Sequence, residues 1–505
     1  MKVNKLFLTG AVALSLGLTA CNNDDVPSVD NSAEGTTFAG LSVSIMKDGM
    51  TKAINDSQED YGGRTEESDL STLDLISNKI PQAWVLGTTP NQPGVFWKVG
   101  NDGLFKVSPW KTDAGQQSMA LLFNKGNISA VIATAQTQVY GTSTDAKDNI
   151  AALSTDSKFV MTSDVAQKDI TDGVDETTVK NGSSESDNVF SFDVERVVAQ
   201  GMVVKGANLS ATTADNKGSV KLDELTYAAV NGATKTYLFR NNAGERAIDA
   251  TTKLYANFKS AIDDYADFEQ AKDPAGTAKE NLIRLGNLGT TNNDLGNYKA
   301  ISVAESATAA KNDRGIYFLE NSVKQEDFAT ENKNFGFYRL AYAKVYTVYV
   351  PNEVWTLNAE GQLIKDEAYT AGETFYRGEG DGVIYKTKEA AKKSLLNPDQ
   401  KAYTYKDGKC AYRALWNRQM DDANKVVKCA DVRRNNTYLL TITAFQGIGM
   451  PWDPSDPNDP NLPKPTDPEE PTNPENPDIE KEDTYMRVEA KVLQWNLVSR
   501  DVVLE

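Results

Sequence analysis

The chain has 505 residues, with 71 acidic against 53 basic side chains and a formal net charge of −18. This balance argues against nucleic acid and anionic lipid head groups as partners, because both are bound through basic surfaces. The absence of histidine excludes Ser-His and Cys-His catalytic pairs, and three cysteines are too few for a Cys-rich zinc module. The composition therefore favours neither an enzyme nor a metal or cofactor site.

The first residues predict export as a lipoprotein. Two lysines precede an apolar stretch of 13 residues, Leu6 to Leu18, which is too short to span a bilayer and suits a signal peptide. The following Thr19-Ala20-Cys21 completes a sequence that resembles the lipobox of bacterial lipoproteins. We expect residues 1–20 to be a signal peptide and Cys21 to be acylated, holding a precursor at the outer membrane. The alternative is an ordinary secretory signal.

The other two cysteines, Cys410 and Cys429, are 19 residues apart. In an exported chain, such a pair predicts one disulfide. Two free buried thiols are the alternative.

Residues 36–46 predict a half-buried strand, because apolar residues alternate there with small or polar ones. The apolar positions are Ala39, Leu41, Val43 and Ile45. A polar loop follows, and it contains Arg64, the first arginine of the chain. Exposed loops with small neighbours are common sites of proteolysis. The bond between Arg64 and Thr65 is therefore a candidate site for an arginine-specific or trypsin-like protease, although Arg64 could also be a solvated loop charge.

From Leu70 to Leu440 the chain is mainly strand-like, with many turn pairs such as Asp407-Gly408. Short strands bounded by turns favour β-sandwiches over a parallel α/β sheet. Helical spacing predicts one helix between Asp249 and Gln270 and a shorter one within 386–397. Five tryptophans could stack on sugars, but we expect them to pack in the core: Trp84, Trp97, Trp110, Trp355 and Trp416.

The chain changes character at residue 451. Residues 451–477 carry 10 of the 18 prolines, which excludes a helix or a central strand and predicts a semi-rigid linker over 451–482. Strand character returns over 483–505, where the apolar phase shifts twice, indicating a bulge or a second strand. The apolar positions are Met486, Val488, Ala490 and Val492, then Trp495 and Leu497. Such a strand is not stable alone, so it must join a sheet of its own molecule or of another.

The strands near the two ends of the chain suggest an assembly mechanism. After a cut at Arg64, the strand 36–46 can leave and expose a groove with unpaired backbone groups. The segment 484–505 of a neighbour could fill that groove by strand addition, with the six apolar residues above as its groove-filling side chains. Such a contact joins different surfaces of two copies, and its repetition makes an open filament.

These features resemble the type V pilins of Bacteroidales, in particular the main structural (stalk) subunits of short, or minor, fimbriae. The similarity lies in LTAC at Cys21, in the position of Arg64, and in three further segments. These are VERVVAQGMVV (Val194 to Val204), VRRNNTYLLTI (Val432 to Ile442), and the linker PWDPSDPNDP with the tail DTYMRVEAKVLQWNLVSRDVVLE.

The resemblance implies a mainly β protein with a few short helices and two transthyretin-like β-sandwich domains, 65–230 and 231–450. A propeptide, 21–64, would precede them, and a detached C-terminal donor strand, 483–505, would follow. It implies a stalk subunit that polymerises with its own copies into a cell-surface fimbrium for adhesion and biofilm formation, with anchor and tip pilins as further partners. The competing hypothesis is a membrane-held surface lipoprotein that binds glycan or protein ligands, which would have no need of a donor strand.

Overall fold

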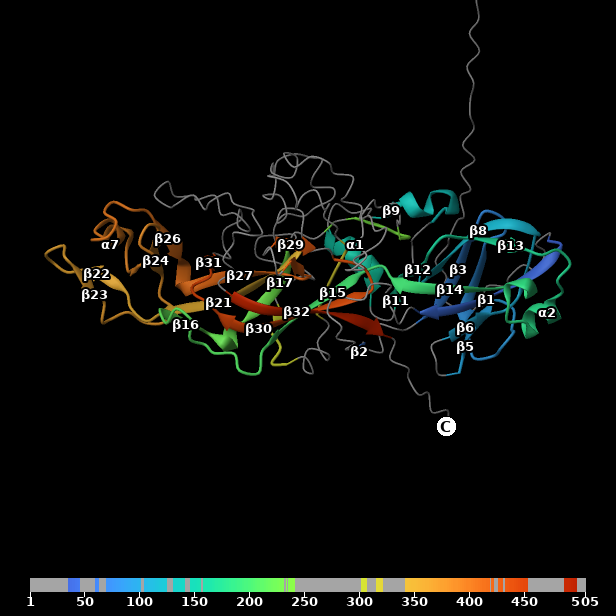
Figure 1. Cartoon of the computed structure of the whole chain (residues 1–505), viewed down its shortest axis with the longest axis horizontal. Coiled ribbons are helices and arrows are strands. Elements are labelled where there is room, and N and C mark those ends of the chain that lie inside the picture. The colour runs from blue at the N-terminus through green and yellow to red at the C-terminus, as the bar shows by residue number, and fades with distance from the viewer. Residues whose placement is uncertain are drawn as a thin grey trace, which may run out of the picture.

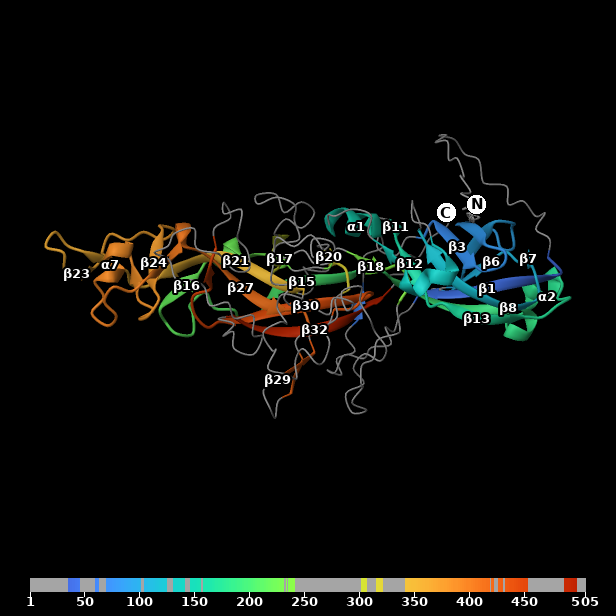
Figure 2. The same ribbon diagram turned by 90° about the horizontal axis from the view of Figure 1, so that it is seen from above.

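The computed structural model describes residues 35–45, 60–62, 70–100, 104–124, 130–140, 146–155, 158–230, 233, 235–240, 301–306, 315–320, 341–417, 419–421, 426–429, 432–452 and 486–496. Within these ranges the protein is mainly β, with several sheets and a few short helices, as the sequence predicts. The molecule is elongated, with an N-terminal sheet at one end, two C-terminal sheets in the middle and a small distal sheet at the other end (Figures 1 and 2). No helix among the described residues is long and apolar enough to cross a membrane.

The N-terminal sheet has ten strands. They are β1 (Thr37–Ile45), β3 (Thr72–Ser77), β4 (Gln82–Leu86), β5 (Val95–Val99), β6 (Leu104–Val107), β7 (Trp110–Thr112), β8 (Gly115–Phe123), β12 (Met161–Ser163), β13 (Ala166–Ile170) and β14 (Val189–Arg196). The order is β12-β14-β1-β6-β5-β4-β3-β8-β13, and β7 also pairs with β1. Since β12 pairs with both β14 and β8, the sheet closes around its core.

The first C-terminal sheet has five strands: β2 (Asp60–Gly62), β15 (Ala199–Lys205), β20 (Ile316–Phe318), β30 (Asn436–Phe445) and β32 (Met486–Asn496). Its order is β2-β32-β30-β15-β20. It therefore combines strands from both ends of the chain with strands from its middle.

The second C-terminal sheet contains β16 (Gly218–Val220), β17 (Thr226–Val230), β19 (Ile301–Ser302), β21 (Tyr342–Pro351), β27 (Lys409–Leu415) and β31 (Met450–Pro451). Its order is β19-β17-β21-β27-β31, with β16 on β21. Trp416 follows β27 and stacks on Phe318 of the first C-terminal sheet, with ring centroids 5.3 Å apart. This contact belongs to one buried apolar cluster that runs from Ala39 to Met486 and so joins the two ends of the chain.

The distal sheet has the order β23-β22-β25-β24-β26. Its elements are β22 (Trp355–Leu357), β23 (Leu363–Lys365), β24 (Phe375–Gly378), β25 (Ile384–Tyr385), α7 (Lys388–Lys392) and β26 (Ala402–Tyr405). The side chain of Thr387 accepts a hydrogen bond from the backbone N–H of Ala390, which caps α7 at its start. This helix lies within the predicted range 386–397 but is shorter than that range.

The remaining elements are short. Three strand pairs are β9 (Val139–Tyr140) with β18 (Thr236–Tyr237), β10 (Ser154–Thr155) with β11 (Lys158–Phe159), and β28 (Gln419–Asp421) with β29 (Val426–Cys429). The helices are α1 (Ala146–Leu153), α2 (Glu176–Asn181), and the 3₁₀ turns η2 (Ile132–Thr137), η3 (Glu185–Asp187), η4 (Leu222–Glu224) and η7 (Lys406–Gly408). The helix predicted between Asp249 and Gln270 lies outside the described residues.

The chain passes from the N-terminal to the C-terminal sheets at Val197–Val198, between β14 and β15. The segment Val194 to Val204 holds the end of β14 and the start of β15, and the residues between the two strands, Val197 and Val198, are apolar. Both of its strands are buried, so no polar turn marks the passage. The predicted linker also begins inside a sheet, because Pro451 pairs with Cys410 in β31–β27.

Candidate functional site

The first candidate feature is β1, which lies inside the N-terminal sheet. It runs parallel to β14, with Gly40 opposite Val189 and Ile45 opposite Val194. On its other side it is antiparallel to β6 and, nearer its start, to β7. Because both edges of β1 are paired, its removal would leave one edge of β14 and one edge of β6 unpaired.

One face of β1 fills the core. The four alternating apolar residues are at most 2% exposed: Ala39, Leu41, Val43 and Ile45. On the same strand, Ser44 is half-buried and hydrogen bonds to Asp193 of β14. A β-strand places successive side chains on opposite faces, so the alternation in the sequence accounts for this burial pattern.

The start of β1 is tied to the loop before α2. The Thr37 hydroxyl donates to the carbonyl of Thr171 at 2.9 Å and accepts from the N–H of Val174 at 3.0 Å. The Asn188 side chain donates to the carbonyl of Phe38 at 2.9 Å. β1 is therefore held by side-chain hydrogen bonds as well as by backbone pairing along both of its edges.

The second candidate feature is β32, the predicted donor strand. It is not detached: it pairs antiparallel with β30 of its own molecule, from Met486 opposite Phe445 to Gln494 opposite Asn436. A bulge lies in β30 between Ile442 and Ala444, so β32 itself is one continuous strand. The reason for the correction is that β30 would otherwise leave an apolar strand edge open, and β32 occupies it.

Of the predicted groove-filling side chains, Met486 is buried against the core. The backbone of Val488, Ala490, Val492 and Trp495 is placed in β32, opposite β30 or β2. Leu497 lies outside the described residues, as do Cys21, Arg64 and Thr65. The strand β2 ends at Gly62, two residues before Arg64.

The predicted disulfide between Cys410 and Cys429 is not formed in the structure. Cys410 is a free, fully buried thiol, and burial raises its pKa to about 12. It lies in the second C-terminal sheet, opposite Thr347 and Pro451. Cys429 lies at the end of the separate β28–β29 pair. The two cysteines are close in sequence, but the intervening hairpin gives them different strand partners.

The tryptophans pack mostly in the core. Trp84, Trp97, Trp110 and Trp416 are at most 8% exposed, and Trp355 is half-buried. The first four are therefore not available to stack on a glycan. Among the described residues, no group of three or more acidic or cysteine side chains is arranged to hold a metal ion.

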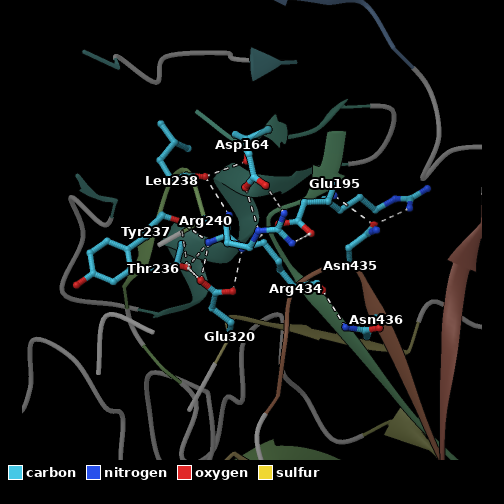
Figure 3. A network of polar contacts seen from close by, with 12 residues as sticks. Asp164, Glu195, Thr236, Tyr237, Leu238, Arg240, Glu320, Arg434, Asn435 and Asn436 are labelled. Atoms are coloured by element: carbon cyan, nitrogen blue, oxygen red, sulfur yellow. Dashed lines mark hydrogen bonds and ion pairs between the residues drawn. The ribbon is translucent and has the colours of Figure 1, made fainter. Parts of the chain in front are cut away.

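A buried ionic network lies between the N-terminal and C-terminal sheets (Figure 3), and the sequence analysis did not identify it. Arg434, just before β30, pairs with Glu320 through Nη2–Oε1 at 2.6 Å and Nε–Oε2 at 2.8 Å. Arg240 pairs with Asp164, with Nε–Oδ1 at 3.0 Å and Nη2–Oδ2 at 2.5 Å. Glu195, at the end of β14, lies between the two arginines, 3.6 Å from Arg240 and 4.0 Å from Arg434.

Hydrogen bonds extend this network across the passage at Val197–Val198. The backbone N–H and Nη1 of Arg196 donate to Oδ1 of Asn435 at 3.2 and 3.1 Å. The N–H of Asn435 donates to the carbonyl of Val198 at 2.8 Å. Asn435 has a φ of 57°, in the left-handed region that asparagine tolerates. The polar run Arg433 to Asn436 ahead of an apolar strand is the sequence signal that could have indicated this site.

The electrostatics of the network are unequal. Burial raises the pKa of Glu195 despite its two arginine neighbours, and its Oε1 has no hydrogen-bond partner. Burial acts to lower the pKa of Arg434, but Glu320 outweighs it and the pKa is raised. Arg434 and Glu320 are thus the tightly bound pair, and Glu195 is the less favourably placed charge.

Comparison with known proteins gives one family match. Residues 403–501 match the family model described as "Major fimbrial subunit protein type IV, Fimbrillin, C-terminal". The matched range contains β27, β30 and β32, including the paired C-terminal strand described above.

Solved structures similar to this chain include a fimbrilin from Porphyromonas gingivalis W83, which is 15% identical to it. The match covers 92% of this chain and 99% of the fimbrilin, with a TM-score of 0.40. A putative cell adhesion protein from Parabacteroides distasonis ATCC 8503 is 11% identical to this chain. The match covers 92% of this chain and 99% of that protein, with a TM-score of 0.40. The C-terminally truncated tip fimbrial protein Mfa3 from Porphyromonas gingivalis is 10% identical to this chain. The match covers 91% of this chain and 100% of Mfa3, with a TM-score of 0.30.

Proposed function

We propose that this protein, whose residues 403–501 match the fimbrillin C-terminal family model, is a fimbrial subunit, namely a stalk pilin that polymerises by strand exchange. It is exported as a lipoprotein acylated at Cys21 and cut after Arg64. The segment 484–505 of one copy then enters the groove that β1 leaves in the next. The observation that carries this proposal is the position of β1 between β14 and β6, on the N-terminal side of Arg64.

The two strands have matching side-chain periods. β1 places four alternating apolar residues in the core, and β32 carries four alternating apolar residues in sequence: Met486, Val488, Ala490 and Val492. Each large apolar side chain buried in the groove contributes roughly 1.5–3 kcal/mol. Several together would make the release of a subunit very slow.

The order of events prevents early polymerisation. Until the cut, β1 occupies both backbone ladders of the groove, so a neighbour cannot enter. After the cut, the segment before Thr65 has no covalent link to the sheet. The filament grows from an anchor pilin and ends in a tip pilin, and it presents an adhesive surface outside the cell.

The test is digestion of the precursor, produced without its signal peptide, by an arginine-specific protease. We expect a single early cut after Arg64 in the mass spectrum, followed by an SDS-resistant ladder on gels. Two controls are matched to the two strands: Arg64→Ala, which should remain monomeric, and deletion of 484–505, which should be cut but form no ladder. A stable monomer after complete cleavage of the intact chain would rule out self-polymerisation.

A further inference from the structure

We propose that the segment removed by the cut occupies both partners of the assembly reaction: β1 fills the acceptor groove, and β2 pairs with the last three residues of the donor strand β32. This inference rests on the proposed cleavage after Arg64. It adds that one proteolytic event makes a subunit competent as acceptor and as donor at the same time.

The geometry places β2 directly on β32. Figures 1 and 2 show β2 beside the end of β32, and the sheet order is β2-β32-β30-β15-β20. The strands run parallel, with Asp60 opposite Gln494, Tyr61 opposite Trp495 and Gly62 opposite Asn496. Among the described strands, Gln494 is therefore the one residue of β32 with partners on both sides.

The two ladders of β32 end at different residues. The pairing with β30 reaches Gln494, opposite Asn436, and stops there. Trp495 and Asn496 are paired only with β2 among the described strands. If β2 leaves, the last two residues of β32 lose their strand partner, and Gln494 keeps one partner in place of two.

An unpaired end is the natural starting point for strand exchange. Separating β32 from β30 requires breaking a long ladder, and an edge without a partner opens more easily than one paired on both sides. A neighbour's groove could bind the free end first and then replace the β30 pairs one at a time. In the uncleaved chain, β2 holds that end closed.

The order of the chain places β1 and β2 on the same side of the proposed cut. β1 and β2 both precede Arg64, and β2 ends two residues before it. A cut after Arg64 therefore places both strands on one released peptide. An uncleaved subunit is then a poor acceptor and a poor donor, which would keep precursors out of a growing filament.

The first experiment measures hydrogen exchange in the uncleavable chain Arg64→Ala. Tyr61→Pro/Gly62→Pro is added to break the β2 ladder, since proline has no N–H and a fixed φ. We expect the hydrogen-exchange rate of the backbone amides in 486–496 to rise about tenfold, because one or two hydrogen bonds are lost. The exchange rate of the amides in 37–45 should not change. Ser57→Pro/Gln58→Pro, in the same segment but outside β2, is the matched control and should leave both peptides unchanged.

The second experiment measures donation. The acceptor is the chain lacking 484–505, cut after Arg64, and the donor is either Arg64→Ala or Arg64→Ala with Tyr61→Pro/Gly62→Pro. SDS-resistant heterodimer should form about ten times faster with the proline donor. Equal rates for the two donors, or equal exchange of 486–496 in the first experiment, would overturn the inference.

The readouts separate this inference from the proposed function. If the wild-type chain forms its ladder after cleavage but the proline substitutions change neither exchange nor donation, strand exchange stands and the proposed role of β2 is wrong. If exchange of 486–496 rises in the proline variant but no ladder forms after cleavage, β2 does hold the end of β32 and polymerisation by strand exchange is wrong.

Discussion

Asp381 shows how a single carboxylate organises the distal sheet. Its Oδ2 accepts hydrogen bonds from Tyr385 at 2.6 Å, Ser394 at 2.6 Å and Gln400 at 2.7 Å. The Ser394 hydroxyl in turn accepts from the N–H groups of Leu396 and Asn397. These bonds fix the loop after α7, whose Leu395 is 90% exposed. The glycine-rich segment Gly378 to Val383 (GEGDGV) thus contains a turn organised around Asp381.

The pKa of Asp381 predicts acid sensitivity of this loop. Burial acts to raise the pKa, but the hydrogen bonds from Ser394, Tyr385 and others outweigh it and hold the pKa below its usual range. A depressed folded-state pKa contributes stability above the unfolded value of about 3.9, and the contribution is lost as pH falls through the folded pKa.

We therefore expect amide exchange of 384–400 to rise in the wild type as pH falls through that window. In Asp381→Asn, exchange should be raised already at neutral pH and change less with acid. The matched control is the exposed Asp399→Asn, which should behave like the wild type. A wild-type exchange profile without this acid dependence, after correction for the intrinsic pH dependence of exchange, would contradict the prediction.

Gly201 is required by close packing between the two C-terminal sheets. A Cβ at this position would lie 2.7 Å from the Trp416 ring and 2.8 Å from the Phe318 ring. Overpacking of this kind costs about 1–3 kcal/mol. We expect Gly201→Val to lower the free energy of unfolding in urea by that amount, whereas Ala359→Val, at an exposed turn, should have little effect. Equal stability of the two variants would show that the rings can move aside.

Among the strands, β1 would contribute to only one state of the molecule if the proposed strand exchange takes place. It completes the N-terminal sheet of the precursor, and in the proposed filament a neighbour's segment takes its place. Substitutions in β1 should therefore affect the precursor and the filament differently.

Leu41→Ala should destabilise the uncleaved chain by about 2–5 kcal/mol, because Leu41 is 1% exposed and a cavity would remain. The dissociation temperature of the SDS-resistant ladder should not change once the released peptide is removed. Ser42→Ala, on the other face of β1, is the control for the precursor. A ladder weakened by Leu41→Ala would mean that β1 remains in the filament.

At the scale of the whole molecule, the buried network decides how the N-terminal and C-terminal sheets are joined. Its members come from β14, from the segments after β12, β18 and β20, and from the segment before β30 (Figure 3). Removing one partner of a buried ion pair is strongly destabilising, because the other charge stays buried without compensation.

Glu320→Gln should therefore lower the free energy of unfolding by on the order of 3 kcal/mol. It should also separate thermal unfolding into two transitions, because it loosens the junction. Glu195→Gln is the matched substitution, and we expect neutral or improved stability at neutral pH. The raised pKa of Glu195 means that folding disfavours its charged form, so its penalty grows as pH rises through the unfolded-state pKa. Calorimetry and urea unfolding check the stability of both variants. A greater loss of unfolding free energy in Glu195→Gln than in Glu320→Gln would show that Glu195, and not Glu320, forms the more stabilising ion pair.

Features that depend on neighbouring residues could be predicted from the sequence. The period of two over 36–46 predicts β1 and its buried face, and the proline-rich segment marks off the C-terminal strand. Burial of four tryptophans and the short helix at α7 also follow from local composition and spacing. These predictions succeed because a strand or a helix repeats its environment every two or every three to four residues.

Which strands pair with one another could not be predicted from the sequence. Sequence reasoning left open whether 483–505 joins its own molecule or another, and the open edge of β30 placed β32 in its own sheet. It could not identify β2, which has only three residues and no periodic pattern. Arg434 and Glu320 are 114 residues apart, and Cys410 and Cys429 have different strand partners. Contacts of this kind depend on the packing of distant segments, so a local pattern such as the polar run Arg433 to Asn436 can mark a site but does not identify the partner.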